Sequence, residues 1–430
     1  MPESETTAQR GRLATSFADP VLRILTAATA ISALGRGVFF TLTVLYFTFV
    51  VGLSAAEIAV ILTVSSAVGV GTSMLGGLLA DRFSARRLLL GFVLLEGVAL
   101  VGYSCASSFV TALLIACVVT GANRAADTSR SAIIGRAFTG DSRVGARAIL
   151  RTVVNIGISV GSAAASIPLL IDTPEAYRVT IAIAGTATLV SSIALARLPR
   201  RVDAAPKVPV QHETSAGHSP WRDPAYLALT VLSALFGIQF GLAEIGLPLW
   251  IVQDTTAPVV MVSVILIINT ALVIALQIPF SRGTHDIRKA GNAVAIAGVC
   301  MAVACAVYAA SAGVAPVLAI VFLSLASIAH AFGEILSSAG TWGLSYELAD
   351  PARFGAYLGL YAMAFSVGTM FTPAIITVTV IQHGTVGWAV LGVLFLGSAL
   401  GMAAIARRAS DRIRVSCDRS TRGIPRRHNG

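Results

Sequence analysis

The sequence predicts an all-α membrane protein in which twelve transmembrane helices form two six-helix bundles, with both termini in the cytoplasm. The first of three observations is composition: 12% of the 430 residues are charged and 56% are hydrophobic. Soluble domains carry about 25% charged residues, which cover their water-facing surface. The composition therefore excludes a soluble enzyme. It also excludes a disordered chain, which needs high charge and low hydrophobicity.

The second observation is a series of long windows without Asp, Glu, Lys or Arg, the longest being 290–333 and 354–406. A membrane-spanning helix needs roughly 20 apolar residues to cross about 30 Å of hydrocarbon. Each of these two windows is long enough for two helices, with turn signals near 310–316 and 382–387. In chain order the expected spans are 22–50, 58–80, 88–105, 109–133, 148–171, 179–197, 225–252, 258–281, 290–310, 316–344, 355–380 and 387–406.

A polar segment divides these spans into two groups of six. Residues 198–224 include Pro199, Pro206, Pro209 and Pro220, and they are expected to form a cytoplasmic linker. The chain is expected to begin with a cytoplasmic N-terminal tail (1–21) and an N-terminal six-helix bundle (22–197). After the linker (198–224) follow a C-terminal six-helix bundle (225–406) and a basic cytoplasmic tail (407–430).

The third observation is that Arg and Lys gather in alternate connections. With the N-terminus inside, the outer connections hold essentially Arg178 alone, whereas the inner ones hold Arg82, Arg86, Arg87, Arg136, Arg143, Arg200, Arg201, Lys207, Arg222, Arg282, Arg288, Lys289 and Arg353. Positive charge marks cytoplasmic loops, so we expect a multi-pass protein of the plasma membrane with both termini inside. This bias also explains the net charge of +10 without a nucleic-acid partner.

The cysteines show no metal-binding spacing, so neither a metal nor another cofactor is expected.

The connection after the second span reads Gly77-Leu-Leu-Ala-Asp81-Arg82-Phe-Ser84-Ala-Arg86-Arg87. It resembles the loop signature of the major facilitator superfamily, Gly-x-x-x-Asp-Arg-x-Gly-x-Arg-Arg, with Ser84 in place of a glycine. The resemblance implies a latch at the inner side. In it, Asp81 binds the N-terminus of the eleventh helix, and Gly77 allows close helix packing. Arg82, Arg86 and Arg87 then need a carboxylate at the inner end of the fourth helix, for which Asp127 is the candidate.

A second set of residues is similar to a branch of this family, the multidrug-exporter-like proton antiporters. It comprises Gly333-Glu334 in the tenth span and the segment 350–357. The branch signature on the fifth span is poorly kept, because Gly157 and Gly161 are followed by Ser162 and an Ala/Ser run. Export and import therefore both stay open at this point.

Ionisable residues inside spans are the sharpest functional signal, because each one costs several kcal/mol unless it is paired or hydrated. The resemblance implies that spans 1, 4, 7 and 10 line the central cavity, and Arg36, Arg124, Glu244 and Glu334 each lie on a different one. A shift of 210 residues places Arg124 on Glu334, so we expect both to face one cavity. Glu96, on a supporting helix, is expected to be a structural partner for Arg36.

These residues suggest a proton-coupling site. Glu334 is the first candidate for the carboxylate that carries the proton, Glu244 is the second, and His330 lies one helical turn before Glu334. The polar residues Asn123, Asn155, Gln239 and Asn269 join Arg36 and Arg124 as candidates for lining the cavity or contacting substrate. Hydrogen bonding between helices is the competing explanation for the amide side chains.

Together these features favour a monomeric secondary transporter, not an enzyme, that moves a small organic solute by alternating access. Its expected partners are the solute, protons and the lipid bilayer. Proton-coupled export is the preferred mode, and a proton-coupled importer or a solute exchanger is the alternative. A membrane-embedded transferase is a remote alternative, because it would show clustered carboxylates for a divalent metal, which this sequence lacks.

Overall fold

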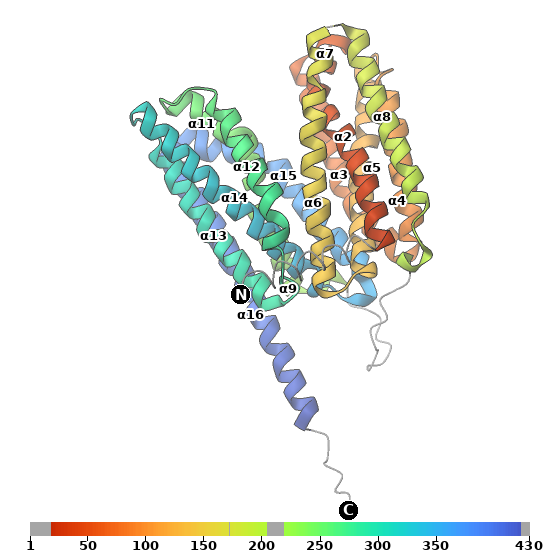
Figure 1. The fold of residues 1–430 in the computed structure, drawn as a ribbon, viewed down its shortest axis with the longest axis vertical. Coiled ribbons are helices and arrows are strands. Elements are labelled where there is room, and N and C mark those ends of the chain that lie inside the picture. The colour runs from red at the N-terminus through yellow and green to blue at the C-terminus, as the bar shows by residue number, and fades with distance from the viewer. Residues whose placement is uncertain (1–18, 172, 204–218, 423–430) are drawn as a thin grey trace, which may run out of the picture.

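The computed structural model describes residues 19–171, 173–203 and 219–422, and within these ranges the chain is helical and contains no strand. The outer parts of the predicted tails and most of the predicted linker (1–18, 204–218 and 423–430) lie outside the described residues. Two bundles stand side by side, as Figure 1 shows.

The first bundle contains the helices before the linker. They are α2 (Pro20–Leu45) with the π-helical turn η1 (Tyr46–Val51), α3 (Ala55–Arg82), α4 (Ala85–Tyr103), α5 (Phe109–Ala137), α6 (Gly140–Ala164), α7 (Ser166–Ile171) and α8 (Pro174–Ala196). Three short 3₁₀ turns lie in the connections of the chain: η2 (Arg200–Asp203), η3 (Pro220–Arg222) and η5 (Pro351–Arg353).

The second bundle contains the helices after the linker. They are α9 (Pro224–Gly237), α10 (Gln239–Gly241), the π-helical turn η4 (Leu242–Gly246), α11 (Leu247–Asp254), α12 (Met261–Phe280), α13 (Ile287–Ala310), α14 (Pro316–Glu347), α15 (Phe354–Ile376), the π-helical turn η6 (Thr377–Ile381) and α16 (Gln382–Arg422).

Many helices begin at a side chain that caps their free amides. Asp19 accepts a hydrogen bond from the amide of Val21 at the start of α2, and Ser54 and Glu57 form a reciprocal capping box at the start of α3. Asp286 caps α13 in the same way through the amide of Lys289. Because these caps lie in the polar connections, most helices extend a few residues beyond the apolar windows that predicted them.

By length and hydropathy, ten helical segments of the described residues can cross a membrane, whereas the sequence predicts twelve spans. The difference arises at two places. The 19-residue α4 carries Arg86, Arg87 and Glu96 and is not among the ten. The segment Pro351–Arg412 counts once, although its backbone leaves the helical conformation at Gly384 (φ 54°, ψ −126°) between α15 and the main part of α16. The count of twelve therefore stays a prediction.

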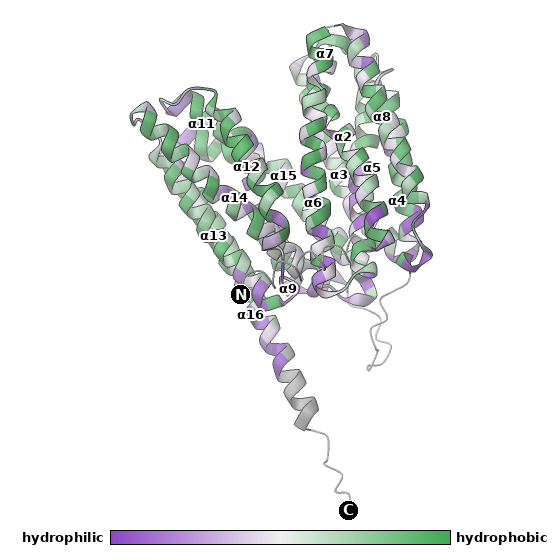
Figure 2. Ribbon diagram, in the orientation of Figure 1, coloured by the Kyte–Doolittle hydropathy of each residue, from purple (hydrophilic) through white to green (hydrophobic). Residues whose placement is uncertain are grey.

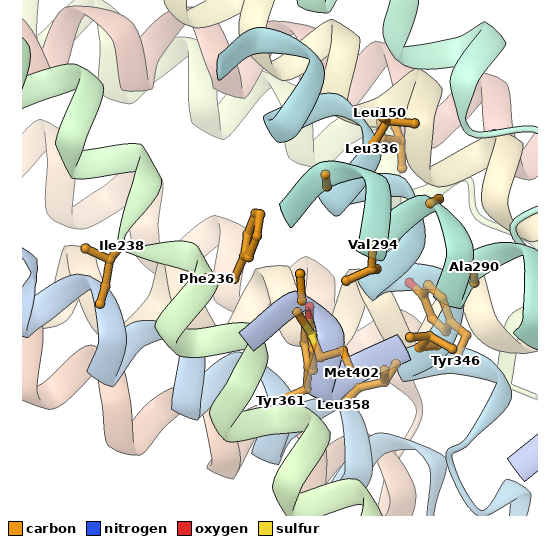
Figure 3. Close-up of a cluster of buried hydrophobic side chains, with 14 of the residues drawn as sticks. Leu150, Phe236, Ile238, Ala290, Val294, Leu336, Tyr346, Leu358, Tyr361 and Met402 are labelled. Carbon is orange, nitrogen blue, oxygen red and sulfur yellow. The ribbon is translucent and has the colours of Figure 1, made fainter. Parts of the chain in front are cut away.

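The apolar side chains either fill the bundle interiors or cover the flanks. In Figure 2 the hydrophobic residues cover the lengths of both bundles, and hydrophilic ones gather where the two bundles meet. Figure 3 shows part of the buried core of the second bundle, where Leu358 and Tyr361 of α15 lie beside Met402 of α16 and near Val294 of α13. Many exposed side chains are large and apolar, as expected of helices that face lipid.

The two bundles converge at one end and diverge toward the end that carries α7 and α11 (Figure 1). We call the first the closed end. It contains the α3–α4 turn, the α5–α6 turn and the start of α15 at Phe354. Helix α3 packs along α15, and α6 packs along α12, so the contact between the bundles is built mainly from these two helix pairs.

Candidate functional site

Asp81 joins the two bundles at the closed end. Its Oδ1 accepts a hydrogen bond from the amide of Gly355 and its Oδ2 accepts one from the amide of Ala356, each at 2.7 Å. Both amides belong to the first turn of α15, where backbone N–H groups lack partners inside the helix and carry partial positive charge. One carboxylate on α3 thus caps a helix of the opposite bundle.

Gly77 lies one turn before Asp81, where α3 crosses α15 most closely. A Cβ atom at Gly77 would fall on the carbonyl oxygen of Gly355 and against Gly359. The same helix offers a contrast at Gly71, where a Cβ atom would meet nothing within 4 Å. The glycine at position 77 is therefore required by the contact between the bundles.

The arginines of the signature lie differently from the expectation. Arg86 donates to the carbonyl oxygen of Leu198 at 3.1 Å and lies 3.9 Å from Asp203, so it is tied within the first bundle. Arg82 and Arg87 are exposed. The cation that pairs with Asp81 is Arg136 of α5, at 3.1 Å.

Ser84, the departure from the family signature, has two partners. It accepts a hydrogen bond from the amide of Arg87 at 3.2 Å, which caps α4, and its hydroxyl donates to Asp203 at 2.8 Å. A glycine at this position could make neither side-chain bond. The turn is therefore anchored to the end of the first bundle by this serine.

Two further polar contacts cross between the bundles at the closed end. Asp141 of α6 accepts from the amide of Gly283 at 2.9 Å and lies 2.6 Å from Nδ1 of His285. Arg143 lies 3.0 Å from Glu347 of α14, with its guanidinium 5.8 Å from the ring centre of Phe354. Both contacts join α6 to the second bundle, and Phe354 directly precedes Gly355, to which Asp81 binds.

A cavity of about 180 Å³ lies between the bundles, and we call it the inter-bundle cavity. Its charged lining residues are Arg124 and Asp127 of α5 and Arg147 and Arg151 of α6, so its lining is positive. Arg147 also stacks over the ring of Trp342, 3.6 Å from the ring centre. Of the predicted polar residues, Gln239 lines this cavity and donates to the hydroxyl of Ser337 at 3.0 Å.

The expected partnership of Asp127 with the loop arginines does not occur. Asp127 pairs with Arg130 of its own helix and lies 3.8 Å from Arg36 of α2. The reason is position, because Asp127 precedes the end of α5 by ten residues, which is about 15 Å along a helix. It lies too far inside the bundle to reach the turn that carries Arg86.

Glu96 is buried as expected but takes a different hydrogen-bond partner. Its Oε1 accepts from Nδ2 of Asn123 at 2.7 Å, on the side of α5 that packs against α4. Arg36, its expected partner, interacts with Glu96 electrostatically and also lies 3.8 Å from Asp127. Neither Asn123 nor Arg36 lines the inter-bundle cavity, and both are partly buried within the first bundle.

Glu334 is held by two residues from opposite bundles. Nη2 of Arg151 donates to its Oε1 at 2.6 Å, and Nδ2 of Asn269 donates to its Oε2 at 3.0 Å. Arg124 lines the inter-bundle cavity, and Glu334 is joined to the wall of that cavity through Arg151 without lining it directly. Arg151 extends from the wall of the inter-bundle cavity and forms an ion pair with the Glu334 carboxylate.

The remaining candidates lie around a second cavity that belongs to the second bundle alone. Glu244, Asn269 and His330 line it, and we call it the second-bundle cavity. Asn155 lies one turn beyond Arg151 on α6, is partly buried and lines neither cavity. The structure therefore divides the predicted site residues among the closed end, two cavities and the bundle interior.

Three residues of the site were missed by sequence reasoning: Arg136, Arg147 and Arg151. Arg136 was counted only as a positive charge of an inner loop. Arg151 lies inside the predicted span 148–171, one residue before the charge-free window that begins at Thr152. Two features of the sequence could have identified Arg151 as a site residue. It lies at the edge of an otherwise apolar run, and its spacing of four residues from Arg147 places both arginines on one helix face.

Comparison with known proteins places this geometry in context. The sequence model of the Major Facilitator Superfamily matches residues 25–373. None of the curated protein sequences matches the chain significantly.

Solved structures of similar fold include the proton:xylose symporter XylE bound to 6-bromo-6-deoxy-D-glucose, with a TM-score of 0.66 and 13% identity over 90% of this chain and 95% of the other. A bacterial homologue of the iron transporter ferroportin in the outward-facing state has a TM-score of 0.69 and 12% identity, over 91% of this chain and 100% of the other. The transporter FucP in the outward conformation has a TM-score of 0.67 and 12% identity, over 91% and 99%. At these identities the likeness is one of fold.

Proposed function

The chain belongs to the Major Facilitator Superfamily, and on that premise we propose that it is a proton-coupled secondary transporter that exports a small organic solute across the plasma membrane. Family and fold make it a multi-pass membrane protein that transports small solutes and is not an enzyme. The proposal adds the direction, the coupling ion and the roles of individual residues.

The proposed orientation places the closed end in the cytoplasm, with the inter-bundle interface sealed on that side. Arg86, Arg136, Arg143 and Lys289 all lie at this end, and positive charge favours the cytoplasmic side. With the bundles diverging toward the other end, the conformation corresponds to an outward-facing state. We propose that the monomer is the working unit.

The observation that carries the proposal is the ion pair between Arg151 and Glu334. It connects α6 of the first bundle to α14 of the second, at 2.6 Å, with both side chains largely buried. Alternating access requires the bundles to separate at the closed end, and that separation breaks the pair. Leaving one buried charge without its partner costs about 3–5 kcal/mol. The pair therefore resists the switch while Glu334 is ionised.

A proton removes this resistance. When Glu334 takes up a proton from the open side, it loses its charge and its attraction for Arg151, so the bundles can part at the closed end. Asn269 keeps one hydrogen bond to Glu334 in either state, because an amide nitrogen can donate to a neutral carboxyl oxygen as well. Release of the proton to the cytoplasm restores the pair. In this cycle the proton moves inward, and its gradient drives the solute outward.

The other charged residues have supporting roles in this proposal. Asp81 stabilises the closed end through the amides of Gly355 and Ala356 and gives way when that end opens. Asp127 lies 3.8 Å from Arg36 and shares the wall of the inter-bundle cavity with Arg124, so its carboxylate balances part of the positive charge there. Glu244 is the second candidate for the proton carrier.

The test is a transport measurement with purified protein in liposomes. A susceptibility screen of an overexpressing strain against a chemical panel first supplies a solute, and an imposed pH gradient should then drive that solute against the direction of proton flow. Accumulation with the proton flow would identify the importer instead. Solute flux that ignores the pH gradient would refute proton coupling.

A further inference from the structure

The second bundle encloses a ligand-sized cavity of its own. The second-bundle cavity has a volume of about 300 Å³, and every residue that lines it comes from η4, α11, α12, α13 or α14. It shares no lining residue with the inter-bundle cavity. Small-molecule sites in proteins occupy roughly 300–1,000 Å³, so this cavity suits a small ligand.

Most of the cavity wall is apolar. Leu247 and Ile251 of α11 form one side, Ile265 and Leu266 of α12 form another, and Tyr308 of α13 adds an aromatic ring. Such walls favour an organic molecule over a hydrated inorganic ion, because burying apolar surface contributes roughly 25 cal/mol per Å². The walls therefore indicate a ligand with an apolar body.

Two polar groups of the cavity lack partners in the described part of the chain. Glu244 makes no hydrogen bond or ion pair there, and it lies on the π-helical turn η4 that precedes Pro248. His330 is only 2% exposed, and its Nε2 is buried without a hydrogen-bond partner. A buried polar atom left unpaired costs about 1–3 kcal/mol. Of the two, Glu244 is the group that a ligand in the cavity can reach, because it is exposed, and a ligand that supplies a hydrogen-bond donor would give it a partner.

The charge around the cavity selects among such ligands. Neither Arg nor Lys lines it, Glu244 is on its wall, and Glu334 lies directly behind Asn269, which lines the cavity and donates to that carboxylate. The inter-bundle cavity has the opposite sign, with Arg124, Arg147 and Arg151 on its wall. Because Glu334 is already paired with Arg151, Glu244 is the carboxylate that acts on a ligand in this cavity, and beside it a cation is stabilised and an anion is repelled.

We propose that the second-bundle cavity binds a small protonated amine with an apolar body. The ammonium group pairs with the Glu244 carboxylate on the cavity wall. The apolar body packs against the wall that Leu247 and Ile265 help to form. That this amine is the exported solute rests on the proposed function, whereas its binding to the cavity does not.

The binding test compares three molecules of nearly equal shape on the purified full-length protein in lipid nanodiscs, by isothermal titration calorimetry at neutral pH. The probes are 2-phenylethylamine, which is protonated, the neutral 2-phenylethanol and the anionic phenylacetate. We expect the amine to bind at least about tenfold more tightly than the alcohol, since a hydrogen bond to a charged group contributes about 1.5–3 kcal/mol. Equal affinity for the amine and the alcohol would overturn the proposal.

Variants locate the site. Glu244→Gln should weaken binding of the amine about tenfold or more and remove its advantage over the alcohol. Asp254→Asn, an equal change of charge at the exposed end of the same helix, should leave the affinity unchanged. Leu247→Trp should fill the cavity and abolish binding. Wild-type affinity in either Glu244→Gln or Leu247→Trp would place the amine elsewhere and overturn the proposal.

The transport assay separates this inference from the proposed function. Selective amine binding by a protein that moves no solute in response to a pH gradient would leave the site standing and refute the transport mechanism. Gradient-driven flux of another solute, with no preference for the amine over the alcohol in calorimetry, would refute the site and leave the transport mechanism standing.

Discussion

Nη2 of Arg151 lies 2.6 Å from Oε1 of Glu334, and this ion pair ties α6 of the first bundle to α14 of the second. Arg151 lines the cavity between the bundles, while Asn269, which holds the other carboxylate oxygen, lines the cavity inside the second bundle. Glu334 therefore stands between two sites of opposite charge. A change in its protonation affects both, and the first two predictions concern this pair.

Glu334→Gln should abolish transport driven by a pH gradient, because glutamine resembles the protonated carboxyl and cannot release a proton. Solute exchange without a gradient should continue, since the variant can still change conformation. Flux into liposomes with and without an imposed pH gradient measures both. Glu175→Gln, in the first turn of α8, is the control and should behave like the wild type. Retained gradient dependence in Glu334→Gln would transfer the proton role to Glu244.

Arg151→Gln should lower thermal stability in detergent, because it leaves Glu334 with Asn269 as its remaining hydrogen-bond partner. Removing one member of a buried pair costs about 3–5 kcal/mol, and we expect somewhat less here because Arg151 is partly exposed. The double variant Arg151→Gln/Glu334→Gln should recover much of the lost stability, since no unpaired charge is left. If the stability lost in the double variant equals the sum of the losses in Arg151→Gln and Glu334→Gln alone, Arg151 and Glu334 do not stabilise each other as their distance indicates.

Asp81→Asn should favour opening of the closed end and reduce transport. The substitution removes a charge that accepts two amides of α15 and pairs with Arg136, and bonds to a charged group contribute about 1.5–3 kcal/mol. Cysteine accessibility at the closed end should rise about tenfold while expression stays near normal. Wild-type accessibility and transport rates would remove Asp81 from the latch.

Gly77→Val should prevent the closed end from sealing, because its side chain would collide with the backbone of Gly355 and Gly359. Gly71→Val on the same helix meets open space and serves as the matched control. Cross-linking between cysteines on α3 and α15 at the closed end should fall in the first variant and persist in the second. Equal cross-linking in both would mean that α3 and α15 do not need this close approach.

The positions of the helices could be predicted well from the sequence. The span predicted at 109–133 is helical over Phe109–Ala137, and that at 316–344 is helical over Pro316–Glu347. In a bilayer the backbone must satisfy its hydrogen bonds within each segment, so an apolar window of the right length is almost sufficient to identify a helix. Ends were less certain because capping depends on single polar residues such as Ser108.

The partners of the charged residues could not be predicted in the same way. Asp127 was assigned to the arginines of the α3–α4 turn and instead pairs with Arg130 and Arg36. Glu96 interacts electrostatically with Arg36, as predicted, but its hydrogen bond comes from Asn123, which was not predicted. Which residues become partners depends on how each helix is rotated and shifted along its axis when it packs against its neighbours. The spacing of residues within one helix does not determine that arrangement.

The amino-acid sequence by itself determined that this chain is a helical membrane protein of the Major Facilitator Superfamily, because hydropathy and the Gly77–Arg87 signature are local properties. The tertiary structure alone decided that Arg151 holds Glu334 and that Glu244 and His330 line a cavity apart from the arginines. These relationships join residues up to 183 positions apart. An ion pair or a cavity wall exists only once two helices have packed at a particular rotation, and that geometry is set by all the contacts between them.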